Sequence, residues 1–377
     1  MNQRKLKIFV SFAIAIVMMW MMGSLVMATS YDPELQSFEQ ATVVAEGRFA
    51  DQPANQGDLQ GAAWRLYSDG VLIVDEGFIN WTGFLSPWDA HRNEIERVAV
   101  TGRVIAGTSL ARLFRDLTNV TTIEGLAYFD TSNVTNMSMM FSFTTSLTSL
   151  DVSNWDTSSV TNMNEMFWIA QSLENLNVSN WDTSSVTNMS NMFSGASSLT
   201  SLDMSNWDTS NVRDMRNMFW SAQSLESLDF SNWDTSNVRD MSQMFVRAES
   251  LVNLNASNWD TSQVTNMSSM FSGASNLTNL DISNWDTSNV RDMQAMFRDA
   301  SSLTEINVLS FDTRNVVDMR YMFSGASSIT SLDLSNFDTR NVTNMNRMFL
   351  GMTSLSEITL GTYFVIIGNV NLPIQPN

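Results

Sequence analysis

Cysteine is absent from the 377-residue sequence, and histidine occurs only once, as His91. Without cysteine the chain can form neither disulfides nor thiolate metal sites, so packing alone must stabilise the fold. A single histidine excludes multi-histidine metal sites and leaves any Ser/His/Asp arrangement dependent on that one residue. The sequence also lacks a phosphate-cradling glycine loop. We therefore expect no enzymatic activity, no catalytic residue and no cofactor.

Lysine is nearly absent as well, because Lys5 and Lys7 are the only two and both precede residue 29. The formal net charge of −19 becomes −22 when the three basic residues before that position, Arg4 among them, are removed. Such an anionic surface repels phosphate backbones and anionic lipid. The composition therefore predicts no nucleic-acid partner.

The first 28 residues have the pattern of a secretory signal peptide, with a basic start, an apolar run over 8–22 and a small-residue site ending at Ala28. Cleavage there would export the protein. The alternative is a retained anchor, since 8–27 is close to the ~20 residues that span a bilayer, and only then would the membrane be a partner. Residues 29–57 are polar and acidic without a sustained period, which predicts a flexible lead-in.

A unit of 26 residues, complete at 147–172, is repeated along the chain without insertion. A strict period of this kind predicts a solenoid, in which each coil is completed by the coils on either side. Its marker is an aromatic residue followed by aspartate, and the aromatic stands at Phe129, Trp155, Trp181, Trp207, Trp233, Trp259, Trp285, Phe311 and Phe337.

Two spacings within a unit predict its elements. Residues 147–152 have the LxxLxL spacing of a short strand, so stacked coils should build a parallel sheet. Apolar residues within 137–144 have the i, i+3, i+4, i+7 spacing of one helix face. The preceding residue, Asn136 and its equivalents, is always Asn or Asp, as a helix N-cap would be, and Gly195 stands where helices tend to stop. We predict an α/β, leucine-rich-repeat-like solenoid of nine coils, each with a short strand and a short helix.

The segments flanking the repeats complete the predicted domain organisation. Residues 58–112 contain alternating β patterns and an Asp-Gly hairpin turn at 69–70, which predicts a β-rich N-terminal cap. The solenoid would occupy 113–360, and 361–377 would add a closing strand and a tail. No LPxTG signal or lipobox is present, so the mode of wall attachment stays open, as does a reading frame truncated after Asn377.

The repeat motifs WDTSxVTNMxxMF and SLTxLDxSNW resemble those of BspA-like bacterial surface proteins, whose repeats are a variety of leucine-rich repeat. The resemblance covers about residues 60 to 360. One departure is that the position usually held by Asn after LxxLxL is Trp or Phe, so a stacked aromatic column should close that corner. The resemblance implies an adhesin on the cell surface that engages host matrix proteins or other cells.

The aspartates after the aromatic marker form a column whose neighbouring charges, ~5 Å apart, would repel by about 0.8 kcal/mol each in water. We favour the interpretation that each Asp accepts an N–H bond in its own Asp-Thr-Ser turn. The alternative is calcium held between successive carboxylates, which would need about six oxygen ligands. The candidates for such a calcium site are Asp130, Asp156, Asp182, Asp208 and Asp234.

The position after the Met-Phe pair varies between units, and it is Trp at Trp168 and Trp220 but Ser in most other coils. An exposed Trp pair, with Ile169, Arg216 and Arg247 nearby, has the aromatic and arginine content of a partner-binding site. The alternative is that both rings pack over neighbouring coils. The Thr column beginning at Thr131 and the outward strand positions are interpreted as plain solvated surface.

These patterns predict an exported, acidic, extracellular or cell-surface protein that acts by binding a host extracellular protein or a bacterial cell surface. Two alternatives stay open. One is a glycan-binding module, and the other is a passive spacer that displays the N-terminal cap through aromatic residues such as Trp81 and Trp88. Neither the oligomeric state nor the identity of the ligand follows from the sequence.

Overall fold

The computed structural model describes residues 41–54 and 58–373. The chain divides into two compact units, Met1–Ala41 and Thr42–Asn377, and every strand described here belongs to the second. The predicted signal peptide, residues 1–28, lies outside the described residues. Within the described ranges no helix has the length and apolar character needed to cross a bilayer.

An antiparallel sheet opens the second unit. Strand β1 (Val43–Arg48) pairs with β2 (Ala63–Tyr67), and β2 pairs with β3 (Val71–Val74) across the predicted Asp-Gly turn. The turn needs glycine because Gly70 has a φ of 78°. The expectation of a flexible lead-in over 29–57 is therefore wrong for residues 43–48, because their backbone bonds to the edge of β2 whatever their polarity.

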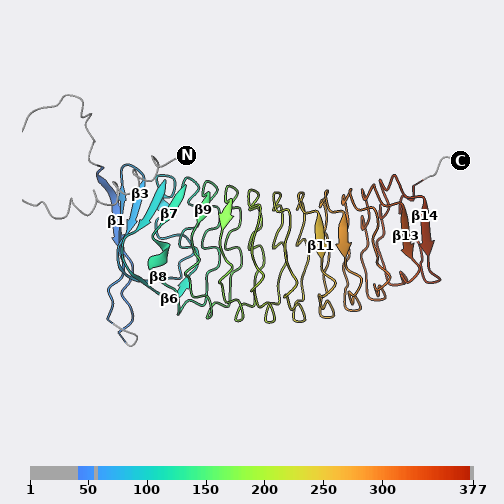
Figure 1. Cartoon of the computed structure of the whole chain (residues 1–377), viewed down its shortest axis with the longest axis horizontal. Coiled ribbons are helices and arrows are strands. Elements are labelled where there is room, and N and C mark those ends of the chain that lie inside the picture. The colour runs from blue at the N-terminus through green and yellow to red at the C-terminus, as the bar shows by residue number, and fades with distance from the viewer. Residues whose placement is uncertain (1–40, 55–57, 374–377) are drawn as a thin grey trace, which may run out of the picture. The chain divides into compact units, whose positions relative to one another are not determined.

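Coiling begins before the first aromatic-Asp marker. Strand β3 continues in parallel into β5 (Arg97–Val100) and β7 (Thr122–Glu124), while β4 (Gly77–Trp81) continues into β6 (Val104–Leu110) and β8 (Phe129–Asp130). Two short 3-10 helices, η1 (Asp89–His91) and η2 (Leu126–Tyr128), lie within these turns. The described chain thus forms about 11 stacked coils, so the prediction of nine is wrong (Figure 1).

The predicted strands recur one coil apart and pair in parallel. They are β9 (Ser149–Leu150) with β10 (Asn175–Leu176), β11 (Asn253–Asn255) with β12 (Asn279–Asp281), and β13 (Ser331–Leu334) with β14 (Glu357–Leu360). In each pair the residues matched across the ladder are 26 apart in sequence. The side of the coil that carries these strands is called the strand side below.

The predicted helix is absent from the described coils, and two consecutive tight turns take its place. In one coil the N–H of Met140 bonds to the oxygen of Met137 and the N–H of Thr144 to that of Phe141. The third residue of each turn, Met139 and Phe143, has a positive φ, as type II turns require. Two four-residue turns place apolar side chains inward at the same spacing as a helix, which is why the sequence pattern was misleading.

The remaining N–H groups of this segment bond between coils rather than along a helix. The N–H groups of Met139, Phe141 and Phe143 donate to the oxygens of the residues 25 positions later, in the next coil. Gly195 and its equivalents are therefore the left-handed third residues of turns and do not end helices. We call the side of the coil that carries this segment the turn side.

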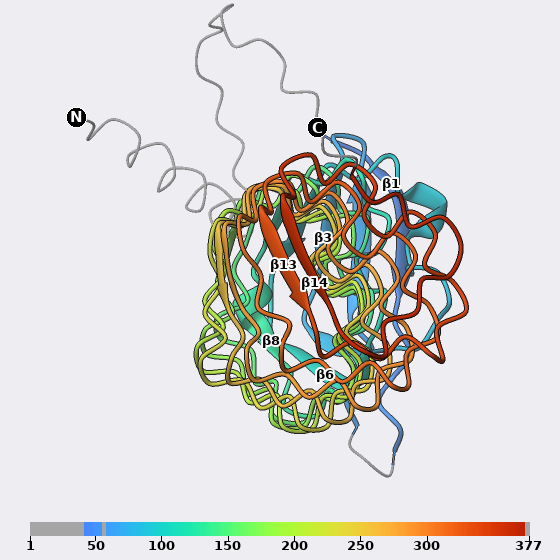
Figure 2. The same cartoon turned by 90° about the vertical axis from the view of Figure 1, so that its right-hand side faces the viewer.

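The interior is built from columns of identical residues, as the view along the stack shows (Figure 2). One column of phenylalanines runs from Phe114 to Phe349 with successive ring centroids 5.5 to 6.2 Å apart and nearly parallel planes. The predicted column at the strand corner is also present, with Trp181 and Trp207 stacked at 6.4 Å. The Met, Val and Leu columns of the repeats between them are almost entirely buried.

Candidate binding surfaces

Three corners of each coil are closed by an Asp or Asn side chain that accepts the N–H of the residue two positions later. In one coil these acceptors are Asn136, Asp151 and Asp156, bonded to the N–H groups of Ser138, Ser153 and Ser158. Asn136 therefore has the acceptor role expected of an N-cap, but it closes a turn instead of starting a helix. Hydrogen bonds from Ser153 and Ser184 hold the pKa values of Asp151 and Asp182 below their usual range, so both stay ionised at neutral pH.

The five aspartates considered for calcium all make this local bond. Asp130, Asp156, Asp182, Asp208 and Asp234 each accept the N–H of the following serine two residues on, at 2.9 to 3.4 Å. Among the described residues no group of three acidic or histidine side chains is arranged to hold a metal ion. The adjacent Thr column is not solvated surface, because Thr131 is 2% exposed. Its hydroxyl donates to the main-chain oxygen of Asp156 in the next coil.

The predicted aromatic site lies on the turn side, and the backbone ladder brings its members into register. The N–H of Ile169 donates to the oxygen of Ser194, and the N–H of Gly195 to that of Trp220. Trp168 and Trp220 therefore flank Ser194 in consecutive coils. Both indoles are half-buried, whereas Ser194 between them is 2% exposed.

The surroundings of the two indoles differ. The Trp168 ring packs edge-on against Phe143 of the preceding coil, with centroids 4.7 Å apart. Ile169 lies over Gly195, where a Cβ would come within 3.2 Å of the Ile169 Cγ1. We call Trp168, Ile169 and Trp220, with the exposed Arg216 and Arg247 beside them, the aromatic patch.

The charged members of the aromatic patch are held in different ways. Arg216 forms an ion pair with Asp214 at 3.4 Å. The aliphatic part of Arg247 covers Gly273, where a Cβ would meet its Cγ at 3.2 Å. The arrangement thus combines two half-exposed indoles with two exposed guanidinium groups, a composition common at protein interfaces.

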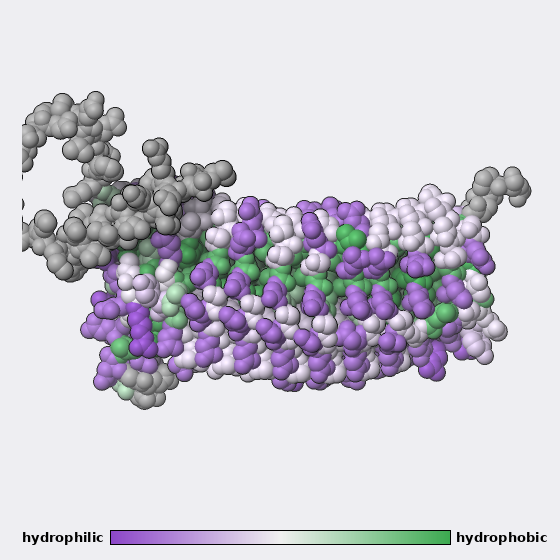
Figure 3. All heavy atoms as spheres, viewed as in Figure 1, coloured by the Kyte–Doolittle hydropathy of each residue, from purple (hydrophilic) through white to green (hydrophobic). Residues whose placement is uncertain are grey.

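The strand side is hollowed rather than flat. A hydrophobic band runs along it between more hydrophilic bands (Figure 3). The items of this band are the middle leucines of the LxxLxL motif, of which Leu228, Leu280 and Ile306 are only partly buried. Two depressions follow the same rows, one of about 480 Å³ around Leu150 and Leu176 and one of about 650 Å³ around Leu254, Leu280 and Ile306.

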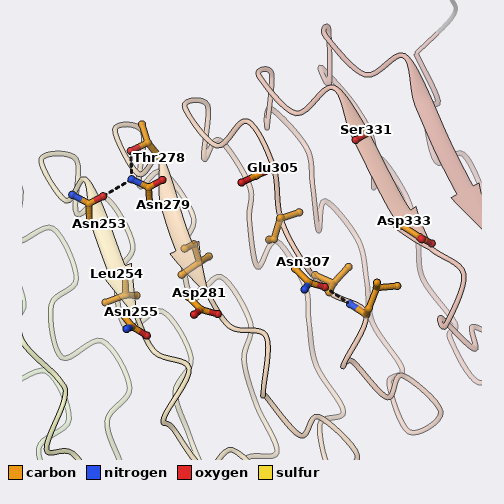
Figure 4. Close-up of a pocket in the computed structure, with 14 residues that line it drawn as sticks. Asn253, Leu254, Asn255, Thr278, Asn279, Asp281, Glu305, Asn307, Ser331 and Asp333 are labelled. Atoms are coloured by element: carbon orange, nitrogen blue, oxygen red, sulfur yellow. Dashed lines mark hydrogen bonds between the residues drawn. The ribbon is translucent and has the colours of Figure 1, made fainter.

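Two polar ridges border this strand-side groove. The amide ridge is the row that includes Asn253 and Asn279, which are hydrogen-bonded to each other, and Glu305 (Figure 4). The carboxylate ridge is the row that includes Asp281 and Asp333 on the other side of the floor. The LxxLxL alternation predicts which side each residue faces, but it carries no signal for the depth of the leucine row, so the groove was missed.

Other residues singled out from the sequence lie in the first coils. His91 ends η1 and its Nδ1 lies 3.2 Å from a carboxylate oxygen of Glu94 on the surface. Trp88 is 1% exposed and stacks on Phe114 at 5.6 Å, so it extends the core column and cannot display a binding surface. Trp81 is partly buried, and its indole N–H donates to the oxygen of Leu85.

Comparison with known proteins gives one family match along the repeats. Residues 108–227, 173–280, 224–309 and 275–362 match the family described as "Mycoplasma protein of unknown function, DUF285". No curated protein matches the chain.

Solved structures with similar coils include a leucine-rich repeat protein from Bacteroides ovatus, which is 17% identical with a TM-score of 0.36, over 80% of this chain and 88% of that one. A leucine-rich repeat protein from Eubacterium ventriosum is 15% identical with a TM-score of 0.30, over 79% and 99%. A leucine rich cell surface protein from Faecalibacterium prausnitzii is 14% identical with a TM-score of 0.37, over 79% and 93%.

Proposed function

The chain belongs to the DUF285 family, and from that premise we propose that it is an exported surface protein whose repeats bind another protein. The partner is an extracellular host protein or a protein on another cell, as the resemblance to BspA-like adhesins implies. A repetitive solenoid presents extended surfaces of the kind that repeat proteins use for binding.

The observation that carries the proposal is the aromatic patch. Most coils have a small or polar residue where Trp168 and Trp220 stand, and Ser142 and Ser194 in that column are almost fully buried. Two large side chains therefore project from a position that the fold can fill with serine. Half-exposed indoles beside arginines are enriched among the residues that dominate binding energy.

The test begins with a binding screen of residues 29–377 against matrix proteins, glycan arrays and partner cells. The double variant Trp168→Ser and Trp220→Ser restores the serine found in other coils. We expect it to weaken binding to the protein or cell identified by at least tenfold, about 1.4 kcal/mol. Binding by surface plasmon resonance and melting by circular dichroism are measured on the same preparations.

The matched control is Leu350→Ser, which changes the same column eight coils beyond Ser142, where Leu350 is 41% exposed. This variant should bind as the parent does. Trp220→Ser alone separates packing from binding, because Trp168 and not Trp220 packs on Phe143. Full binding by a folded double variant would overturn the patch, and selective capture of glycans would overturn a protein partner.

A further inference from the structure

The strand-side groove has a charge of one sign along the repeats. All nine acidic side chains on its rows are exposed. None of the ten arginines between residues 147 and 360 lies on these rows, and lysine is absent there. The nine acids are Asp151, Glu174, Asp203, Glu226, Asp229, Asp281, Glu305, Asp333 and Glu357.

The groove is also apolar at its floor. The partly buried Leu280 and Ile306 line the larger depression, and Leu309, which is 52% exposed, lies at its edge where most other coils have serine. A ligand that fits must therefore bring positive charge to the ridges and apolar surface to the floor. An extended polypeptide with lysine or arginine side chains meets both requirements, whereas a nucleic acid or acidic glycan would be repelled.

The spacing along the carboxylate ridge narrows the ligand further. Asp151 and Asp203 are two coils apart, as are Asp229 and Asp281, and Asp281 and Asp333. At ~4.8 Å per coil, a two-coil interval is about 9.6 Å. A polyproline II segment advances ~3.1 Å per residue, so every third side chain recurs after about 9.3 Å on the same side.

We propose that the strand-side groove binds an extended, basic polypeptide segment in the polyproline II conformation, with a lysine or arginine at about every third position. The basic side chains pair with the carboxylate ridge, and the intervening residues lie on the leucine floor. This surface is separate from the aromatic patch, so the inference does not depend on that patch being a binding site.

The carboxylate ridge allows its charge to be removed without changing the fold. Asn177, Asn255 and Asn307 occupy the same row as Asp151, and each accepts the N–H of the residue two positions later as the aspartates do. The groove variant changes Asp151, Asp203, Asp229, Asp281 and Asp333 to Asn. The control variant changes Asp156, Asp182, Asp208, Asp234 and Asp260 to Asn, which removes the same charge from the Asp-Thr-Ser corner.

The probe is a labelled (Lys-Pro-Pro)6 peptide, titrated with the protein at 0.15 M salt and followed by fluorescence anisotropy. We expect the groove variant to bind at least tenfold more weakly and the control variant to change affinity by less than threefold. Similar losses in both variants would show attraction by net charge alone and would overturn the site. Unchanged binding by the groove variant would overturn it as well.

Two further comparisons test the register and the independence of this site. A peptide of the same composition with its lysines in one block should bind several-fold more weakly, and equal affinity would overturn the spacing. The Trp168→Ser and Trp220→Ser double variant should bind the peptide as the parent does. Loss of peptide binding in that variant would assign the peptide to the aromatic patch instead, so failure of either proposal can be distinguished.

Discussion

The indole Nε1 of Trp181 donates a 3.1 Å hydrogen bond to the main-chain oxygen of Val152, one coil earlier. Trp207 makes the same bond to Val178. Trp233 does not, and its buried Nε1 has no acceptor. In that coil Phe230 takes the place of the smaller core residue and packs edge-on against the Trp233 ring at 4.5 Å.

This difference predicts unequal effects of the same substitution. Trp181→Phe should destabilise the protein by at least about 1 kcal/mol more than Trp233→Phe, because only the first leaves a buried carbonyl without its donor. Urea unfolding followed by circular dichroism would measure both variants. Equal shifts of the midpoint would contradict a structural role for the indole bond.

Asp214 should oppose folding at neutral pH. Burial raises the pKa of Asp214, and the carboxylate of Asp240 acts in the same direction. A group whose pKa is higher in the folded state favours folding below its unfolded pKa and loses that contribution as the pH rises through the folded pKa. Asp214→Asn, which restores the residue of Asn188, should raise the melting temperature at pH 7 by roughly 1 to 3 °C.

A control of opposite sign is available for that experiment. Hydrogen bonds from Ser184 lower the pKa of Asp182, so its contribution is present above the unfolded pKa and is lost as the pH falls through the folded pKa. Asp182→Asn should therefore lower the melting temperature at pH 7. A rise for both variants would indicate relief of general charge repulsion instead of local effects.

Left-handed residues in the turn segment predict a stabilising glycine. Ser221 has a φ of 53° in the column where other coils have Gly195 and Gly273. Ser221→Gly should stabilise the protein by roughly 0.5 to 1 kcal/mol, since a side chain in this conformation costs about 1 to 2 kcal/mol and the flexibility of glycine offsets part of the gain. Ser224→Gly, outside the left-handed region, should not stabilise. The two melting temperatures decide the matter.

Calcium should have little effect on stability. Each Asp of the Asp-Thr-Ser corner already accepts a backbone N–H in its own turn, and the described residues offer no three-carboxylate cluster. Adding millimolar calcium or a chelator should leave the melting temperature within about 1 °C, because only a ligand bound to the native state raises it. A chelator-induced drop of many degrees would establish the calcium alternative.

Periodicity and residue chemistry were sufficient to predict the stacking, the parallel strands and the aromatic corner. A 26-residue period leaves equivalent residues nowhere to lie except above one another, so the ring column of Trp181 and Trp207 follows directly. Coils without the marker could not be counted this way. Trp88 and Phe114 continue the phenylalanine column under a different local sequence, and the predicted number of coils was therefore too low.

Local spacing could not distinguish a helix from two tight turns, because both return to the interior after three or four residues. The distinguishing sign is the column of Gly195, Gly273 and Gly325, which marks a left-handed position inside the apolar pattern. The aromatic patch was placed in the right column by the Ser-to-Trp variation, and its binding role stays a proposal. The groove depends on how far the leucine floor lies below its ridges, which is a property of packing between coils.

The uniform bonding between coils has a consequence for how the length of the protein can change. Every repeat meets its neighbours through the same rows, with Thr157 bonded to Asp182 and Thr183 bonded to Asp208 in the same way. A block of 26 residues can therefore be removed or inserted between equivalent positions with each new junction reproducing an existing one. Unequal recombination between the repeats of the gene would lengthen or shorten the solenoid by whole coils, about 4.8 Å at a time, while both of its ends stay the same.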